Sequence, residues 1–337
     1  MINVLQAGRF LAALAVVLLH AGSATSAFVA PPPAGVRFVL GYGYLGVDFF
    51  FALSGFIIHY TMTTAPRSLA DFAYGRLTRI MLPYWPIGLT LAVAYVLLPD
   101  LSASGRAWGW LPTLTLIPSQ HPPALGVAWT LQHELLFYLL YGLLLALRKL
   151  PLGLVIWGGM IALASPFEWH RWPLLAVLLD PVNIEFLAGV LAAHVVVSDR
   201  GGAAGPYARM RTIAWAAGSV AVCVAGFVAL GADKPDRWLI GVGCACVLPV
   251  LYDLERAGRI NVPGWLVFGG AMSYALYLIH NPLISLVARA AGGLGLGWLP
   301  AFAAMVGTGL LAGALYHLWW EKPVLRRARR AWARNTS

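Results

Sequence analysis

Residues 5–21 read LQAGRFLAALAVVLLHA, an apolar stretch in which Arg9 and His20 are the two ionisable side chains. They are 11 positions apart. In an α-helix this spacing separates them by roughly 20° around the axis and about 16 Å along it, so both lie on one face. Ionisable residues inside a membrane usually face the protein interior and mark functional sites. We therefore interpret the pair as parts of one site. The alternative is Arg9 at the headgroups and His20 as a neutral packing residue.

Composition places the chain among membrane proteins. It has 337 residues, of which 60% are hydrophobic and 11% are charged, and its mean hydropathy is +0.76, too apolar for ordinary soluble domains. Its 14 Trp and 13 Tyr are typical of interfacial aromatic belts. The net charge of +10 comes from short loops and a C-terminal run, which indicates positive-inside topology and disfavours nucleic-acid binding.

The distribution of apolar residues predicts an all-α, polytopic membrane bundle. A spanning helix needs about 20 mostly apolar residues, and we identify ten such segments, at 4–24, 41–62, 81–98, 127–147, 151–166, 182–198, 212–231, 238–253, 266–288 and 298–320. Residues 107–118 and 172–179 are apolar but too short to span, and predict interfacial or re-entrant pieces. Without a 20- to 50-residue repeat, residues 1–337 are expected to form a single membrane domain.

Loop charges predict the orientation of this bundle. Ten spans put both termini on one side, and assigning that side to the cytoplasm places 17 of the 23 Lys and Arg residues there, as the positive-inside rule requires. Arg9 then lies near the cytoplasmic end of the first helix and His20 in its outer half. Residues 321–337 form a basic cytoplasmic tail in this interpretation.

Two further arginines lie on the predicted cytoplasmic side. In FAYGRLTRIMLPYW (72–85), Arg76 and Arg79 are three positions apart, ahead of Pro83. Such a pair suits phosphate, although a plain positive-inside anchor is the alternative. Because Arg9 opens onto the same side, we expect three arginines to converge on one polyanionic ligand.

The segment WTLQHELLFY (129–138) places a carboxylate, Glu134, one helical turn before Tyr138. A carboxylate in an apolar run needs a partner. We expect Glu134 to orient His20 and stabilise its imidazolium, with a structural salt bridge to an arginine as the alternative.

Polar residues interrupt two other apolar segments. In GYLGVDFFFALSGFII (43–58), Asp48 and Ser54 are candidate ligand-binding residues, with helix capping and close packing as the alternatives. In GGAMSYALYLIHNPLISL (269–286), Tyr277 and His280 are neighbours on one helix face. Pro282 predicts a local disruption there that exposes carbonyls to a polar cavity, or a kink beside a satisfied histidine.

Several signals of other chemistry are absent from the sequence. It contains no phosphate-cradling glycine loop, zinc-ligand spacing or nucleophile elbow. We therefore disfavour nucleotide hydrolysis and expect no bound metal.

Taken together, several motifs resemble the membrane-bound acyltransferase 3 family, in particular the bacterial exopolysaccharide O-acetyltransferases. They are Arg9 with His20, GVDFFFALSGF (46–56), RLTRIMLPYW (76–85), WTLQHELLFY (129–138), SYALYLIHNP (273–282) and EKP (321–323). The resemblance implies ten helices in the bacterial inner membrane, a cytoplasmic acyl-CoA donor and a sugar hydroxyl acceptor on the outer side. It maps the family's essential arginine, histidine and acidic residue onto Arg9, His20 and Glu134.

We accordingly predict an acetyl transfer from acetyl-CoA to a hydroxyl of an extracytoplasmic or lipid-linked polysaccharide. The donor-binding residues are Arg9, Arg76 and Arg79; the catalytic residues are His20 as general base, Glu134 and Arg9; the substrate-binding residues are Asp48, Ser54, Tyr138, Tyr277 and His280. A covalent acyl-histidine is a variant of this mechanism.

The sequence leaves open the acceptor and some partners. A short Pro-rich loop at Pro31 departs from the family pattern, so a macrolide or a cell-wall sugar remains an alternative acceptor. A transporter is the alternative from another class. The expected partners are acyl-CoA, a carbohydrate or lipid-linked oligosaccharide and the bilayer, with no nucleic acid; polysaccharide assembly proteins and a homo-oligomer stay open.

Overall fold

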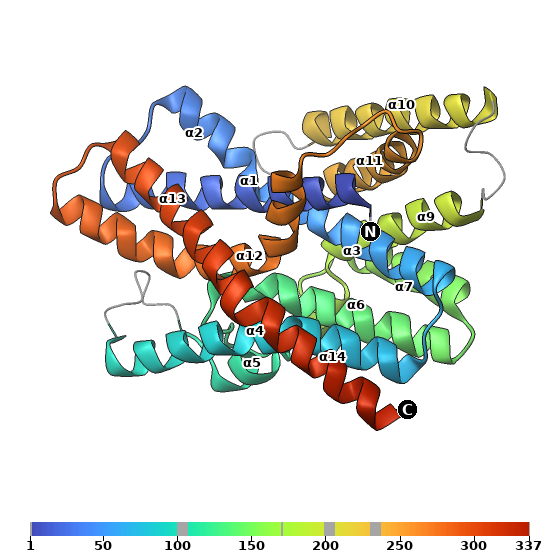
Figure 1. The fold of residues 1–337 in the computed structure, drawn as a ribbon, viewed down its shortest axis with the longest axis horizontal. Coiled ribbons are helices and arrows are strands. Elements are labelled where there is room, and N and C mark those ends of the chain that lie inside the picture. The colour runs from blue at the N-terminus through green and yellow to red at the C-terminus, as the bar shows by residue number, and fades with distance from the viewer. Residues whose placement is uncertain (1, 100–106, 170, 199–205, 230–236, 337) are drawn as a thin grey trace.

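The computed structural model describes residues 2–99, 107–169, 171–198, 206–229 and 237–336, and every regular element in these ranges is helical (Figure 1). The longer helices are α1 (Asn3–Phe28), α3 (Leu45–Thr64), α4 (Leu69–Leu97), α6 (Trp129–Ala146), α7 (Leu150–Ala164), α9 (Ile184–Ser198), α10 (Pro206–Ala229), α11 (Trp238–Arg256), α12 (Gly264–Gly293), α13 (Trp298–Tyr316) and α14 (Lys322–Thr336). The short ones are α2 (Ala34–Gly41), η1 (Tyr42–Tyr44), α5 (Trp110–Thr115), η3 (Gly126–Ala128), α8 (Pro173–Leu178), η4 (Pro181–Asn183) and the π-helical turn η5 (His317–Glu321).

Helix positions agree with the predicted segments. Each of the ten apolar segments falls on a helix, and the six-residue helices α5 and α8 occupy the two stretches predicted to be too short to span. Residues 230 and 231, the end of one predicted segment, lie outside the described residues.

Length and composition support a polytopic membrane bundle. Within the described residues, seven helical stretches are long and apolar enough to cross a membrane, and two shorter apolar helices, Leu150–Ala164 and Thr212–Gly226, accompany them. Helix α6 has 18 residues, with His133 and Glu134 in its first two turns. The total of ten spans and the cytoplasmic termini remain predictions.

Small residues bring the central helices into close contact. A Cβ atom at Gly270 of α12 would collide with the carbonyl oxygen of Gln6 in α1, and one at Gly46 of α3 would collide with that of Ala12. Glycine permits such backbone approach in membrane helices. Helix α1 is therefore fixed between α3 and α12, which sets the faces that these three helices present to one another.

Prolines do not end the helices that contain them. Helix α4 starts 12 residues before the predicted segment and continues through Pro83 and Pro86. Pro86 has no N–H for the carbonyl of Leu82, and Trp320 Nε1 donates to that carbonyl instead, at 3.1 Å. Helix α12 is likewise continuous from Gly264 to Gly293. The predicted disruption of the helix at Pro282 is therefore wrong.

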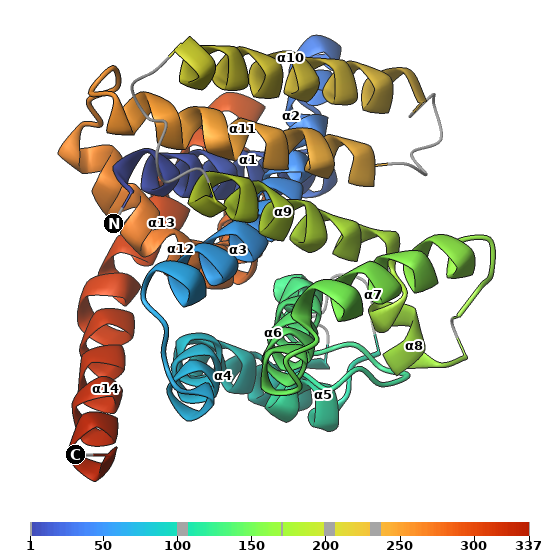
Figure 2. The same cartoon turned by 90° about the vertical axis from the view of Figure 1, so that its right-hand side faces the viewer.

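The basic C-terminal segment is helical. The turn η5 joins α13 to α14, so that α14 continues the direction of the preceding helix (Figure 1) and runs beside the start of α4 to the C-terminus near its tip (Figure 2). The sequence interpretation treated residues 321–337 only as a basic tail.

Candidate functional site

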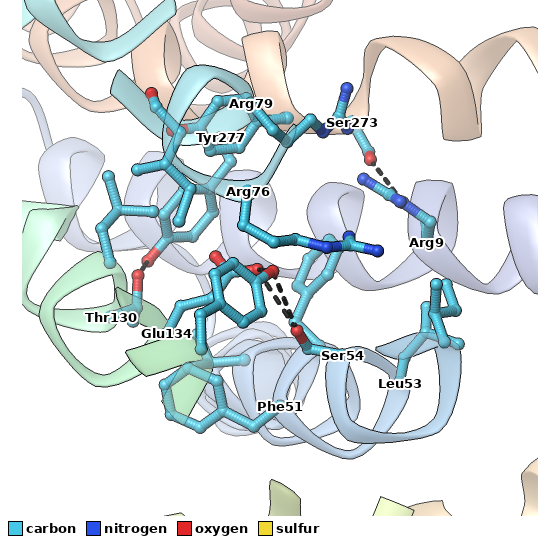
Figure 3. Close-up of a pocket in the computed structure, with 17 residues that line it drawn as sticks. Arg9, Phe51, Leu53, Ser54, Arg76, Arg79, Thr130, Glu134, Ser273 and Tyr277 are labelled. Atoms are coloured by element: carbon cyan, nitrogen blue, oxygen red, sulfur yellow. Dashed lines mark hydrogen bonds between the residues drawn. The ribbon is translucent and has the colours of Figure 1, made fainter. Parts of the chain in front are cut away.

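A cavity lies between α1, α3, α4, α6 and α12 (Figure 3). Its empty space, including the open mouth, is about 810 Å³. Its polar lining consists of Arg9, Ser54, Arg76, Arg79, Thr130, Glu134, Ser273 and three tyrosines, Tyr138, Tyr274 and Tyr277. The structure thus brings seven predicted site residues to one cavity, whereas His20, Asp48 and His280 do not line it.

The three arginines of the cavity have different partners. Arg9 donates from Nε to Ser273 Oγ at 3.2 Å, and Arg79 forms a salt bridge of 3.1 Å with Glu321. The Arg76 guanidinium lies over the rings of Phe72 and Tyr138, at 5.9 and 5.6 Å from their centroids. Among the described contacts, only Arg79 of the three is paired with a carboxylate. The cavity is therefore suited to an anionic ligand.

Glu134 is held by hydroxyl groups. It accepts hydrogen bonds from Tyr138, on its own helix, and from Ser54 of α3 at 3.3 Å. Its carboxylate faces the cavity (Figure 3). No hydrogen bond in the described part of the chain joins Glu134 to His20, so the structure does not supply the contact through which Glu134 was expected to orient the imidazole.

His20 contacts another histidine instead. Its Nδ1 lies 2.9 Å from the carbonyl oxygen of Val16 and 3.3 Å from Nε2 of the buried His280. His280 Nδ1 lies 3.1 Å from the carbonyl oxygen of Leu276. Because a carbonyl only accepts, both neutral rings carry their hydrogen on Nδ1. His20 Nε2 therefore keeps a lone pair that can accept a proton.

Tyr277 separates the cavity from the histidine pair. Its ring lines the cavity and packs against Phe50 at 6.2 Å, while its other neighbour is His280 at 5.7 Å. Its hydroxyl lies 2.9 Å from Thr130 Oγ1. The cavity and the histidines thus share one aromatic wall.

Asp48 lies in a separate polar cluster. Arg237, the residue before α11, donates from Nε and Nη2 to Asp48 Oδ1 at 2.9 and 2.6 Å. The buried Glu185 of α9 also faces Asp48. Asp48 therefore contacts protein side chains and not the cavity, and its ligand-binding role gains no support from this geometry.

Two functional candidates, Glu321 and His317, were not among the predicted site residues. Glu321 is fully buried and bonds both Arg79 and His317, the latter at 2.7 Å. A carboxylate at the end of an apolar segment is a signal in itself, and π-helical turns are frequent at functional sites.

Within the described residues, no group of three or more His, Cys, Asp or Glu side chains is arranged to hold a metal ion.

The fold and the cavity define a helical, multi-pass membrane protein with an arginine-lined interior site. Residues 2–317 match the family described as "Acyltransferase domain", and the chain belongs to this family. The resemblance inferred from the motifs is thereby confirmed, and the protein is a membrane O-acyltransferase.

Two curated relatives are similar over most of their length. The chain is 31% identical over 327 residues to "Exopolysaccharide production protein ExoZ" of Rhizobium meliloti (strain 1021), an alignment that covers 90% of this chain and 95% of the relative. It is 27% identical over 369 residues to "Acyltransferase MdmB" of Streptomyces mycarofaciens, with 94% and 90% covered. No solved structure matches the chain.

Proposed function

We propose that the protein transfers an acetyl group from cytoplasmic acetyl-CoA to a sugar hydroxyl of an extracytoplasmic or lipid-linked polysaccharide. The observation that carries this proposal is the meeting of Arg9, Arg76 and Arg79 on one cavity inside an apolar bundle. The name of the Rhizobium relative, which refers to exopolysaccharide production, supports the acceptor class. The proposal includes ten spans in the bacterial inner membrane, with both termini in the cytoplasm.

The donor would occupy the cavity and the adjoining face of α1. Coenzyme A combines a phosphate-rich head with a thin pantetheine arm that ends in the thioester. Arg9 and Arg76 offer guanidinium groups without a carboxylate partner among the described contacts, suited to bidentate phosphate binding. The arm would run toward His20, about 16 Å along the helix from Arg9, past Tyr277.

His20 is the proposed general base. Its Nε2 takes the proton of the acceptor hydroxyl while the hydroxyl oxygen bonds to the thioester carbonyl carbon. The carbon–sulfur bond then breaks, and the coenzyme A thiolate leaves and receives the proton from His20. His280 acts as a positioning residue, because its Nε2 accepts from His20 Nδ1 and stabilises the tautomer that leaves Nε2 free.

Donor binding and donor hydrolysis test this assignment without a known acceptor. Purified wild-type, Arg9→Ala and His20→Ala proteins in detergent are compared for acetyl-CoA affinity and slow hydrolysis, with thermal unfolding as the folding control. We expect weaker binding in Arg9→Ala. His20→Ala should bind normally and hydrolyse about 10²- to 10⁴-fold more slowly. A folded wild type that ignores acyl-CoA would contradict the proposal and favour a transporter.

The direct and covalent routes predict different labelling. Turnover with radiolabelled acetyl-CoA, stopped by denaturation, leaves no label on the protein if His20 acts as a base alone. If His20 instead becomes labelled and loses the label during turnover, the reaction proceeds through an acyl-histidine intermediate and not by direct transfer.

A further inference from the structure

The C-terminal helix is too long to lie wholly inside a bilayer. The continuous helical stretch Trp298–Asn335 has 38 residues, or about 57 Å at 1.5 Å per residue, against a hydrocarbon thickness of about 30 Å. Its apolar part is α13, and its basic part is α14. We therefore expect α14, the basic end, to be the part that extends past the hydrocarbon.

Specific contacts fix α14 against the start of α4. The rings of Tyr74 and Trp332 stack with centroids 4.1 Å apart and planes at 12°. Trp332 Nε1 donates to Asp71 Oδ1 at 2.7 Å, and the Tyr74 hydroxyl donates to the carbonyl of Ala328 at 3.0 Å. These contacts set the rotation of α14 about its own axis.

The rotation of α14 about its axis determines which of its arginines lie toward α4 and which point away from it. The residues facing α4 are the buried Leu325 and the half-buried Ala328 and Trp332. At about 100° per residue, Arg329 lies next to this face, about 40° from Leu325, whereas Arg330 points to nearly the opposite side. Arg329 is also within electrostatic reach of three arginines of the α4 region, Arg67, Arg76 and Arg79.

These four arginines, Arg67, Arg76, Arg79 and Arg329, form a group that we name the basic lip. Two of them line the cavity. The carboxylates beside the lip already have partners: Asp71 is bonded by Ser68 and Trp332, and Glu321 by Arg79 and His317. Positive charge is thus in excess where α14 packs on the start of α4, beside the two arginines that line the cavity, and a ligand with several phosphates would reduce the mutual repulsion.

We propose that the basic lip binds the phosphates of the donor's nucleotide head, so that α14 forms one wall of the acyl-CoA site. This inference rests on the proposed function, since it assigns the head of the same donor. Arg329 and Arg67 contact the phosphates farthest from the thioester, and Arg76 reaches those nearer the cavity. Glu321 holds Arg79 in place and links the start of α14 to the site.

Donors with and without phosphates test the lip. Wild type, Arg329→Ala and the matched Arg330→Ala are reconstituted in uncharged phosphatidylcholine nanodiscs, and kcat/KM for thioester hydrolysis is measured with acetyl-CoA and with S-acetylpantetheine. We expect Arg329→Ala to lower the value for acetyl-CoA about five- to tenfold. Arg330→Ala should change it less than about twofold, and neither variant should change the value for S-acetylpantetheine.

Three results would overturn the inference while the proposed function stands. Arg329→Ala could behave like Arg330→Ala, it could slow both donors equally, or its defect could arise only in nanodiscs with anionic phosphatidylglycerol. The last result would assign the lip to lipid headgroups. A folded wild type that hydrolyses neither donor would instead contradict the proposed function itself.

Discussion

Two clusters of arginines and carboxylates lie against helix α3 and differ in which charge is in excess and in whether a cavity adjoins them. In the first, Arg237 directs two nitrogens at Asp48, with Glu185 beside them. In the second, three arginines line a cavity that also contains Glu134. Carboxylates outnumber arginines in the first cluster, and arginines outnumber cavity-lining carboxylates in the second.

The difference separates a structural cluster from a ligand-binding one. The Arg237 guanidinium is covered by the rings of Tyr44 and Trp129, at 5.3 and 6.0 Å, and its bonds to Asp48 join α3 to the start of α11. Around Arg9 and Arg76, hydroxyl and ring partners leave the charge available to a ligand. A buried arginine is thus a weaker sign of function than an arginine that lacks a carboxylate partner and faces a cavity.

The largest expected effect is on stability, at the closed cluster. Arg237→Gln leaves Asp48 buried without its cation, and breaking such a pair destabilises proteins by about 3–5 kcal/mol. Thermal unfolding in detergent should show a marked loss of stability. The double variant Asp48→Asn/Arg237→Gln should recover much of it.

The exposed Arg37 provides the matched control, because Arg37→Gln removes the same charge from the neighbouring α2 and should leave unfolding unchanged. Loss of acetyl-CoA binding by folded Arg237→Gln, at normal stability, would show that this cluster also binds ligand.

The next effect concerns the open cluster. Arg76→Ala removes a cation that has only ring partners in the described structure, so we expect normal thermal unfolding and an acetyl-CoA affinity lowered about 10- to 50-fold. Isothermal titration in detergent measures the affinity. An unfolding shift as large as that of Arg237→Gln, with normal affinity, would mean that Arg76 is structural and that the contrast between the clusters is mistaken.

The third effect concerns catalysis beyond the cavity. His280→Gln offers a longer, flexible acceptor to His20 Nδ1, so the imidazole loses orientation while the cavity arginines are untouched. We expect the kcat of acetyl-CoA hydrolysis to fall about tenfold with KM unchanged. A changed KM with normal kcat would place His280 in donor binding.

The sequence was sufficient to predict the positions of the helices and some of the residues that share the cavity. Each apolar segment became a helix because about 20 apolar residues have few alternatives in a bilayer. The convergence of Arg9 with Arg76 and Arg79 was predicted by assigning all three to one side of the membrane, since loop charges predict which end of a span faces the cytoplasm. Residues of neighbouring helices that share a predicted depth in the membrane can be expected to lie close together.

The rotation of each helix about its own axis, and hence the partner of each polar side chain, could not be predicted in the same way. Asp48 pairs with Arg237 and His20 with His280, across 189 and 260 positions of sequence. Which faces meet depends on close packing such as that of Gly270 on Gln6, and a single sequence does not say which small residue meets which helix. Glu134 was therefore expected beside His20, and its hydroxyl partners Ser54 and Tyr138 were not predictable.

The smallest expected effect tests the charge balance of the cavity directly. Tyr138→Phe removes a hydroxyl that holds Glu134, so the carboxylate becomes free to compete with phosphate for Arg9 and Arg76. We expect acetyl-CoA affinity to fall about threefold, and the fall should disappear in Tyr138→Phe/Glu134→Gln, because the competing charge is gone. Titration of both variants and of Glu134→Gln alone, each checked by thermal unfolding, measures this. If Tyr138→Phe weakens binding equally with Gln at position 134, the hydroxyl contacts the donor itself and the Glu134 charge does not control affinity.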